Sequence, residues 1–76
     1  MVIKTTNHFL EKCEERYETR TSNWMIETFK YICKLIKKNK IYPKKWNQPQ
    51  TFEIPYKWLT YIYKKENWEY LLLTVY

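Results

Sequence analysis

The first third of the chain shows a helical pattern of apolar and charged positions. Four apolar residues over 7–20 fall within about 100° of one another at helical spacing: Phe9, Leu10, Cys13 and Tyr17. The glutamates of the same stretch fall on the opposite side: Glu11, Glu14, Glu15 and Glu18. The spacing therefore predicts a helix over 7–20 that packs its apolar side against the rest of the protein.

A second helical pattern follows three candidate N-cap residues. Thr21, Ser22 and Asn23 have side chains that can accept hydrogen bonds from the free N–H groups at a helix start. The apolar stripe of this pattern consists of Met25, Phe29, Ile32, Cys33 and Ile36. Lysines lie opposite this stripe, and those near its end suit the negative C-terminal end of the helix dipole. We expect a second amphipathic helix here.

Prolines interrupt the chain after the second helical pattern. Pro43, Pro49 and Pro55 each disfavour helix in the residue before them, so we expect 41–50 to be an extended or turning connection. The run 56–63 fits both an amphipathic helix and a strand. Its tyrosine, tryptophan, threonine and isoleucine content favours the strand.

The C-terminal run 68–76 has a similar strand-forming composition. Paired with 56–63 through a turn at 64–67, it predicts a hairpin, to which 51–54 can add a third, edge strand. The hairpin face expected beneath the helices carries Trp58, Ile62, Leu71, Leu73 and Val75. No charge follows Glu69, so this strand should present an open apolar edge that a second copy could cover, which predicts a possible homodimer.

Together these elements predict an α+β fold in which two N-terminal helices pack on a small C-terminal antiparallel β-hairpin or three-stranded sheet. The alternative is a mostly α fold with a third helix at 55–66. The chain has 76 residues, which predicts a single small domain (1–76). Hydrophobic residues make up 45% of it and aromatic residues 20%, which is enough apolar surface for the chain to fold.

Positive charge is concentrated in the middle of the chain. The net charge is +6, and between Thr28 and Phe52 there are seven lysines and no acidic residue. From Met1 to Glu27, by contrast, four basic residues are balanced by five acidic ones. Such segregation creates a directional field that would draw a polyanion to one side of the molecule.

The residue types available argue against several kinds of catalysis. The chain contains no glycine and no aspartate, so it lacks the loops that cradle phosphates and any carboxylate cluster built on aspartate. His8 is the only histidine and Ser22 the only serine, and a histidine at the start of a helix is expected to lie on the surface. We therefore expect a protein that is not an enzyme and that needs no cofactor or metal.

Two cysteines and a lack of long apolar runs indicate a cytoplasmic protein. Cys13 and Cys33 lie on predicted apolar faces, so we expect them to be buried thiols rather than metal ligands or disulfide partners. The longest apolar run, 70–73, is far too short to cross a bilayer. We expect no signal peptide and no membrane partner, and a location in the cytoplasm, or in the host cytoplasm for a viral protein.

The lysine-rich segment also contains two aromatic residues, Tyr42 and Trp46, that we expect to be exposed. Lysines pair with phosphates and release counterions, whereas Tyr42 and Trp46 can stack on unpaired bases. The candidate residues for binding nucleic acid or a protein partner are Lys30, Lys34, Lys37, Lys38, Lys40, Tyr42, Lys44, Lys45 and Trp46. A secondary contact is predicted on the first helix at Lys12, Arg16 and Arg20. The pattern predicts binding of nucleic acid, single-stranded or RNA, and leaves RNA and DNA as alternatives.

Two other interpretations fit the same residues. The lysines can simply solvate a surface helix, with Trp46 folded back onto the core. A short chain rich in lysine and aromatic residues is also typical of accessory proteins of phages and mobile elements. This alternative is an inhibitor or adaptor that binds an acidic surface of a host protein or nucleoprotein complex, with Trp24, Tyr31 or Trp46 as its anchor.

Overall fold

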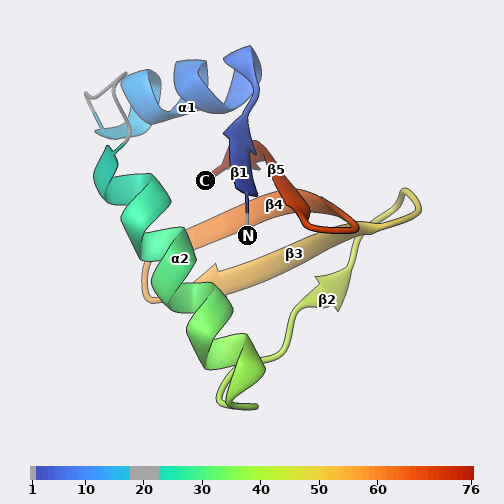
Figure 1. Cartoon of the computed structure of the whole chain (residues 1–76). Coiled ribbons are helices and arrows are strands. Elements are labelled where there is room, and N and C mark those ends of the chain that lie inside the picture. Colours follow the sequence, from blue (N-terminus) through green and yellow to red (C-terminus); the bar gives the residue numbers. More distant parts are fainter. Residues whose placement is uncertain (1, 18–22) are drawn as a thin grey trace.

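The computed structural model describes residues 2–17 and 23–76, which form two helices and a five-stranded mixed sheet (Figure 1). The elements in chain order are β1 (Val2–Thr5), α1 (Asn7–Tyr17), α2 (Asn23–Lys37), β2 (Lys44–Lys45), β3 (Thr51–Tyr56), β4 (Leu59–Glu66) and β5 (Glu69–Val75). Both predicted helices are therefore present over the part of the chain that is described.

The sheet brings the two ends of the chain together. Its strand order is β1-β5-β4-β3-β2, with β1 parallel to β5 and every other neighbouring pair antiparallel. The pairing of β1 runs along the first part of β5, from Val2 opposite Glu69 to Thr5 opposite Leu72. The open edge predicted for the C-terminal strand is covered there by β1, so the argument for a homodimer does not hold at these residues.

The predicted fold class is wrong in the size and type of the sheet. A hairpin or three-stranded antiparallel sheet was expected, and the structure has five strands of mixed direction. The alternative third helix at 55–66 is also wrong, because these residues belong to β3, β4 and the turn between them. The prediction omitted β1 and β2, which have only four and two residues and so carry little periodic signal.

The predicted pairing of the last two strands is present as β4 and β5, but a two-residue turn inside the predicted strand 56–63 changes the bounds of the first of them. Tyr56 pairs with Leu59, so Lys57 and Trp58 form the turn, and Lys57 adopts a left-handed backbone conformation with φ of 56°. Glycine or asparagine usually occupies such a position. A lysine there gives no turn signal in the sequence, so the strand was predicted to begin at 56 and the next turn at 64–67, whereas β4 begins at Leu59 and the antiparallel pairing of β4 with β5 continues to Glu66 and Glu69.

This shift changes which residues face the helices. Tyr61, Tyr63 and Leu72 face the helices, whereas Ile62 and Leu71 alternate with them and point to the other side of the sheet. A bulge at Ile62 and Tyr63 then returns Val75 to the helix side. Of the face predicted to be covered, Val75 alone belongs to the core cluster that helices and sheet share, Ile62 is buried outside that cluster, and Trp58 lies exposed in the turn.

Aromatic rings dominate the contact between α2 and the sheet. The ring of Phe29 lies 5.3 Å from that of Tyr61, 5.1 Å from Tyr63 and 5.7 Å from Tyr70, measured between centroids. The hydroxyl of Tyr61 donates a buried hydrogen bond of 2.8 Å to the carbonyl of Met25, which connects β4 to the first turn of α2. The core residues shared by helices and sheet are Phe9, Cys13, Met25, Phe29, Ile32, Cys33, Ile54, Leu59, Tyr61, Tyr63, Leu72 and Val75.

Thr6 caps the start of α1 and attaches it to the last strand. Its Oγ1 accepts a hydrogen bond of 3.1 Å from the backbone N–H of Phe9, which is the usual N-cap interaction. The same hydroxyl lies 3.1 Å from the carbonyl oxygens of Leu72 and of Leu73, to which it can donate. One side chain therefore satisfies a free donor of the helix and an acceptor of β5.

Replacing Thr6 with alanine should lower the free energy of unfolding by about 1–2 kcal/mol, because both hydrogen bonds are lost. Thr6→Ser keeps the hydroxyl and should recover most of this loss, whereas Thr6→Val keeps the shape and should not. Urea denaturation followed by circular dichroism measures all three variants. Equal stability of the serine and valine variants would contradict this role for the hydroxyl.

The end of α2 turns the chain toward the lysine-rich segment. Asn39 has φ of 57°, and its N–H donates to the carbonyl of Ile36 at 3.0 Å. The N–H of Lys40 donates to the carbonyl of Leu35 at 2.9 Å. These two bonds form a Schellman motif, with asparagine in the place that glycine usually takes.

Candidate functional site

The lysines predicted to bind a ligand are all exposed, and we refer to them together as the lysine surface: Lys30, Lys34, Lys37, Lys38, Lys40, Lys44 and Lys45. Three of them follow one another along successive turns of α2, two lie just after its C-terminal end, and two form the edge strand β2. The lysine surface therefore runs from the outer side of α2 to the edge of the sheet.

Most of the lysine surface has no ion-pair partner within 2–17 and 23–76. The exception is Lys30, whose Nζ lies 3.2 Å from Oε1 of Glu27 on the preceding turn. Elsewhere, Lys4 and Lys64 do pair with glutamates, at 3.1 Å in each case. The positive charge of the lysine surface is thus left for an external anion, as the acid-free sequence of this segment suggested.

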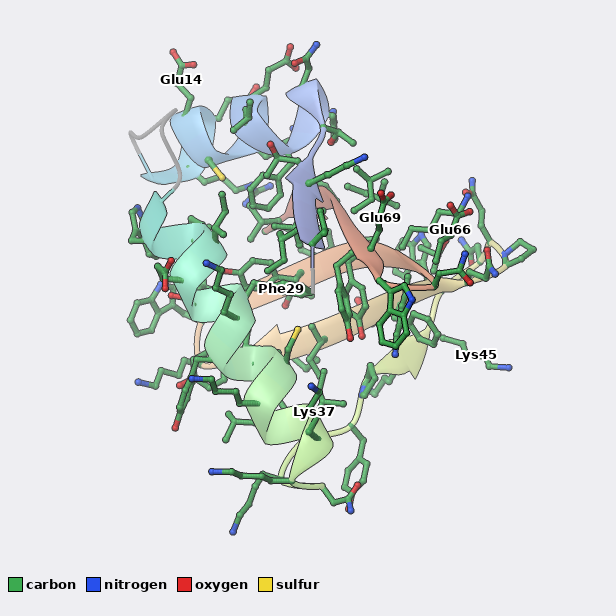
Figure 2. All side chains as sticks on the ribbon, in the orientation of Figure 1. Glu14, Phe29, Lys37, Lys45, Glu66 and Glu69 are labelled. Carbon is green, nitrogen blue, oxygen red and sulfur yellow. The ribbon has the colours of Figure 1, made fainter. Side chains whose placement is uncertain are left out.

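The lysine surface is spread over more than one side of the molecule. Lys44 pairs with Glu53 and Lys45 with Phe52, so the side chains of Lys44 and Lys45 point to opposite faces of the sheet. Figure 2 shows Lys37 near the end of α2 and Lys45 extending from β2 away from that helix. A ligand that reached all of these lysines would have to follow the surface around this end of the protein.

Two aromatic residues accompany the lysines between α2 and β3. Tyr42 is 70% exposed, and Trp46 is also exposed. The backbone N–H of Trp46 donates to the carbonyl of Thr51 at 2.9 Å, which holds the residue at the end of β2. Trp46 is therefore not folded into the core, and both rings are accessible to a ligand.

The predicted secondary contact lies on a different part of the molecule. Lys12 forms an ion pair of 3.1 Å with Glu15, and Arg16 is exposed in the last turn of α1. Arg20 lies outside the described residues. Figure 1 shows α1 at one end of the molecule and the C-terminal end of α2 with β2 at the other, so the structure does not bring these two basic regions together.

A groove between α2 and the β3–β4 turn was not predicted from the sequence. Its volume is about 430 Å³, and we refer to it as the aromatic groove, lined by Trp24, Glu27, Thr28, Tyr31, Tyr56, Lys57, Trp58 and Leu59. The sequence predicts Trp24 and Tyr31 as anchors for a protein partner, but it places Tyr56, Lys57 and Trp58 in a strand. The groove depends on the turn at Lys57, for which the sequence carries no glycine or asparagine signal.

The rings in the aromatic groove come from both of its walls. Tyr31 of α2 and Tyr56 of β3 meet edge to face, with centroids 6.1 Å apart and an interplanar angle of 68°. The Nζ atom of Lys57 lies 5.5 Å from the centroid of Tyr56, which is within reach of a cation–π interaction. Trp58 also lines the groove, and 72% of its surface is exposed.

Burial raises the pKa values of two side chains in the core, which makes them less reactive. Burial raises the pKa of the Cys33 thiol to about 11, although the positive charges of Lys65 and Lys37 act in the opposite direction. Burial likewise raises the pKa of Tyr63, with smaller contributions from Cys33 and Tyr70. The Cys33 thiol is therefore protonated at neutral pH, the state in which a cysteine is a poor nucleophile.

Other candidate groups occupy ordinary positions. His8 is exposed in the first turn of α1, as expected, and Cys13 is buried in the core. Within the described ranges, no three histidine, cysteine or acidic side chains are grouped so that they could hold a metal ion. Neither α1 nor α2 is long and apolar enough to cross a membrane.

The described structure is thus a two-layer arrangement of helices on a mixed sheet, with an exposed lysine surface and an aromatic groove. No protein-family model matches the chain, and no curated protein or solved structure is significantly similar to it.

Proposed function

We propose that this protein binds nucleic acid through the lysine surface. The observation that supports the proposal best is the run of exposed lysines along α2 and on to β2, most of which have no carboxylate partner in the described part of the chain. Each lysine that meets a phosphate releases condensed counterions, which favours binding and makes it sensitive to salt.

Exposed rings beside these lysines favour single-stranded nucleic acid or RNA. Tyr42 and Trp46 lie between the lysines of α2 and the start of β3, and both are open to solvent. Stacking of an unpaired base on such a ring contributes about 1–3 kcal/mol, whereas the bases of a duplex are already stacked on each other.

The salt dependence of binding tests this proposal. The dissociation constant of a labelled single-stranded oligonucleotide is measured at several salt concentrations by fluorescence anisotropy. Each lysine–phosphate contact contributes about 0.7–0.9 to the slope of log K against log salt concentration. Removing Lys34 and Lys37 together should therefore lower that slope by up to about 1.4–1.8.

A double variant of equal charge provides the control. Lys4 and Lys64 already pair with Glu69 and Glu66, so the K4A/K64A variant loses the same formal charge from outside the lysine surface. Its slope should change much less than that of K34A/K37A. If both double variants lowered the slope equally, only net charge would matter and the proposed surface would be wrong.

The second candidate function is that of an inhibitor or adaptor that docks the same lysines on an acidic surface of a host protein or nucleoprotein complex. The exposed tryptophan and tyrosine side chains favour it, because these residues dominate interface hot spots. Binding to a polyglutamate probe, together with no binding to oligonucleotides at low salt, would support this candidate over the first.

A further inference from the structure

The aromatic groove and the lysine surface are neighbours on α2, where Tyr31 of the groove lies one turn before Lys34. Lys34 and Lys38 follow Tyr31 by three and seven residues, and Lys38, just beyond the end of α2, still donates a backbone hydrogen bond of 3.1 Å to the carbonyl of Lys34, so all three lie along one side of the helix and its C-terminal end. Lys57 contributes a positive charge from the opposite wall. Cationic groups therefore flank the rings on both sides, at positions where the phosphates of a strand could lie while its bases entered the groove.

The rings offer flat surfaces to an incoming group. Tyr31 and Tyr56 meet edge to face, so the edge of one ring covers part of one face of the other. Half of the surface of Tyr31 is exposed, and Trp58 is more exposed still. The groove volume of about 430 Å³ lies within the range typical of small-ligand sites. A planar aromatic group is the shape that such walls accept best.

The charges in and around the groove favour an anionic ligand, although the lining includes one glutamate. Glu27 is the acidic residue among the lining side chains, and its Oε1 is already paired with Lys30 at 3.2 Å. The neighbouring charges of Lys34, Lys38 and Lys57 are not paired with carboxylates in the residues that the structure describes. The field around the groove is therefore positive overall.

The β3–β4 turn has a lysine at a left-handed backbone position, which is unusual for this residue type. Lys57 has φ of 56°, a left-handed conformation that is sterically unfavourable for lysine. The β4–β5 turn has the same layout, but there Asn67, a residue that tolerates this conformation, precedes Trp68. The lysine at position 57 thus places a positive charge at the groove where asparagine would be the easier choice.

We propose that the aromatic groove binds unpaired bases of single-stranded nucleic acid, with Lys34, Lys38 and Lys57 contacting the adjoining phosphates. The inference rests on the proposed function, which it extends by naming the groove, in addition to Tyr42 and Trp46, as the main site where unpaired bases stack. Stacking between the rings of the two walls holds the bases, and the lysines fix the direction of the strand across α2.

Two tryptophans at equivalent turn positions allow a matched test. Trp58 and Trp68 each follow a left-handed residue in a two-residue turn and are 72% and 81% exposed, but Trp58 alone lines the aromatic groove. Trp58→Ala should weaken binding of a single-stranded oligonucleotide about 5- to 150-fold, the loss expected for one stacked base. Trp68→Ala should leave it unchanged.

Conservative variants separate base stacking from simple apolar contact. Trp58→Phe keeps a flat ring and should retain most of the affinity, whereas Trp58→Leu keeps an apolar side chain and should behave like Trp58→Ala. Circular dichroism of each variant checks that the fold is intact, which is expected because Trp58 lies in an exposed turn.

The outcomes distinguish the groove from the lysine surface. A loss specific to Trp58→Ala and to single strands, with the salt slope unchanged, supports the groove. Equal affinities of wild type, Trp58→Ala and Trp68→Ala, with the salt slope still dependent on Lys34 and Lys37, would overturn the groove while the proposed function stands. Equal affinity of the wild type for duplex and single strand also overturns it. The absence of salt-sensitive binding to any oligonucleotide overturns both proposals.

Discussion

Replacing Phe29 with alanine should lower the free energy of unfolding by about 3–5 kcal/mol, enough to leave much of this small domain unfolded. Phe29 is completely buried. The centroid of its ring lies 5.1 to 5.7 Å from the ring centroids of Tyr61, Tyr63 and Tyr70. Truncation removes these contacts and leaves a cavity at the centre of the helix–sheet interface. A domain of this size is stable by only a few kcal/mol, at about 0.05–0.15 kcal/mol per residue.

Urea denaturation followed by far-ultraviolet circular dichroism measures this loss. Phe29→Leu keeps most of the volume and should cost less than half as much as the alanine variant. Phe52→Ala is a useful comparison, because Phe52 is only partly buried although it stacks on Tyr63 at 5.6 Å. A smaller loss for Phe29→Ala than for Phe52→Ala would show that the centre of the core has been placed wrongly.

Raising the pH above about 9 should destabilise the protein through Cys33. Burial raises the pKa of its thiol to about 11 in the folded protein, against 9.0 for an unperturbed thiol. Between these two values the unfolded chain has lost the proton and the folded chain has kept it. The unfolded state then binds fewer protons, so stability is complete below pH 9 and falls by up to about 1.4 kcal/mol per pH unit until pH 11.

The urea midpoint measured from pH 7 to 11 tests this prediction. Cys33→Ala removes the titrating group and should flatten the decline between pH 9 and 10. The raised pKa of Tyr63 acts in the same direction at higher pH, so some decline should remain in this variant and diminish further when Tyr63→Phe is added. An identical pH profile for wild type and Cys33→Ala would exclude the thiol as the cause.

Local patterns in the sequence were sufficient to predict the helices. The apolar residues of α1 and α2 repeat at helical spacing, and the core contains Phe9, Cys13, Met25, Phe29 and Ile32 as expected. An amphipathic helix buries one stripe whatever it packs against, so its identity depends on neighbouring residues alone. The exposure of the lysines opposite this stripe was predictable for the same reason.

The sheet depends on contacts that no local pattern reveals. Strand β1 pairs with β5 across almost the whole chain, from Val2 opposite Glu69. The β3–β4 turn rests on a left-handed lysine, and a turn displaced by a few residues reassigns the faces of the strands that follow. The fold class and the covered face were therefore predicted wrongly, although 59–63 was correctly taken as strand-forming.

The sequence by itself determined that this chain has two amphipathic helices, a strand-rich C-terminal half and a continuous basic segment, because composition and spacing express these features within a few residues. The tertiary structure alone decided that the sheet has five strands, that Lys44 and Lys45 point to opposite faces, and that Tyr31, Tyr56 and Trp58 share one groove. Each of these depends on strand register and on pairing between distant segments, and a shift of one residue in register exchanges the two faces of a strand.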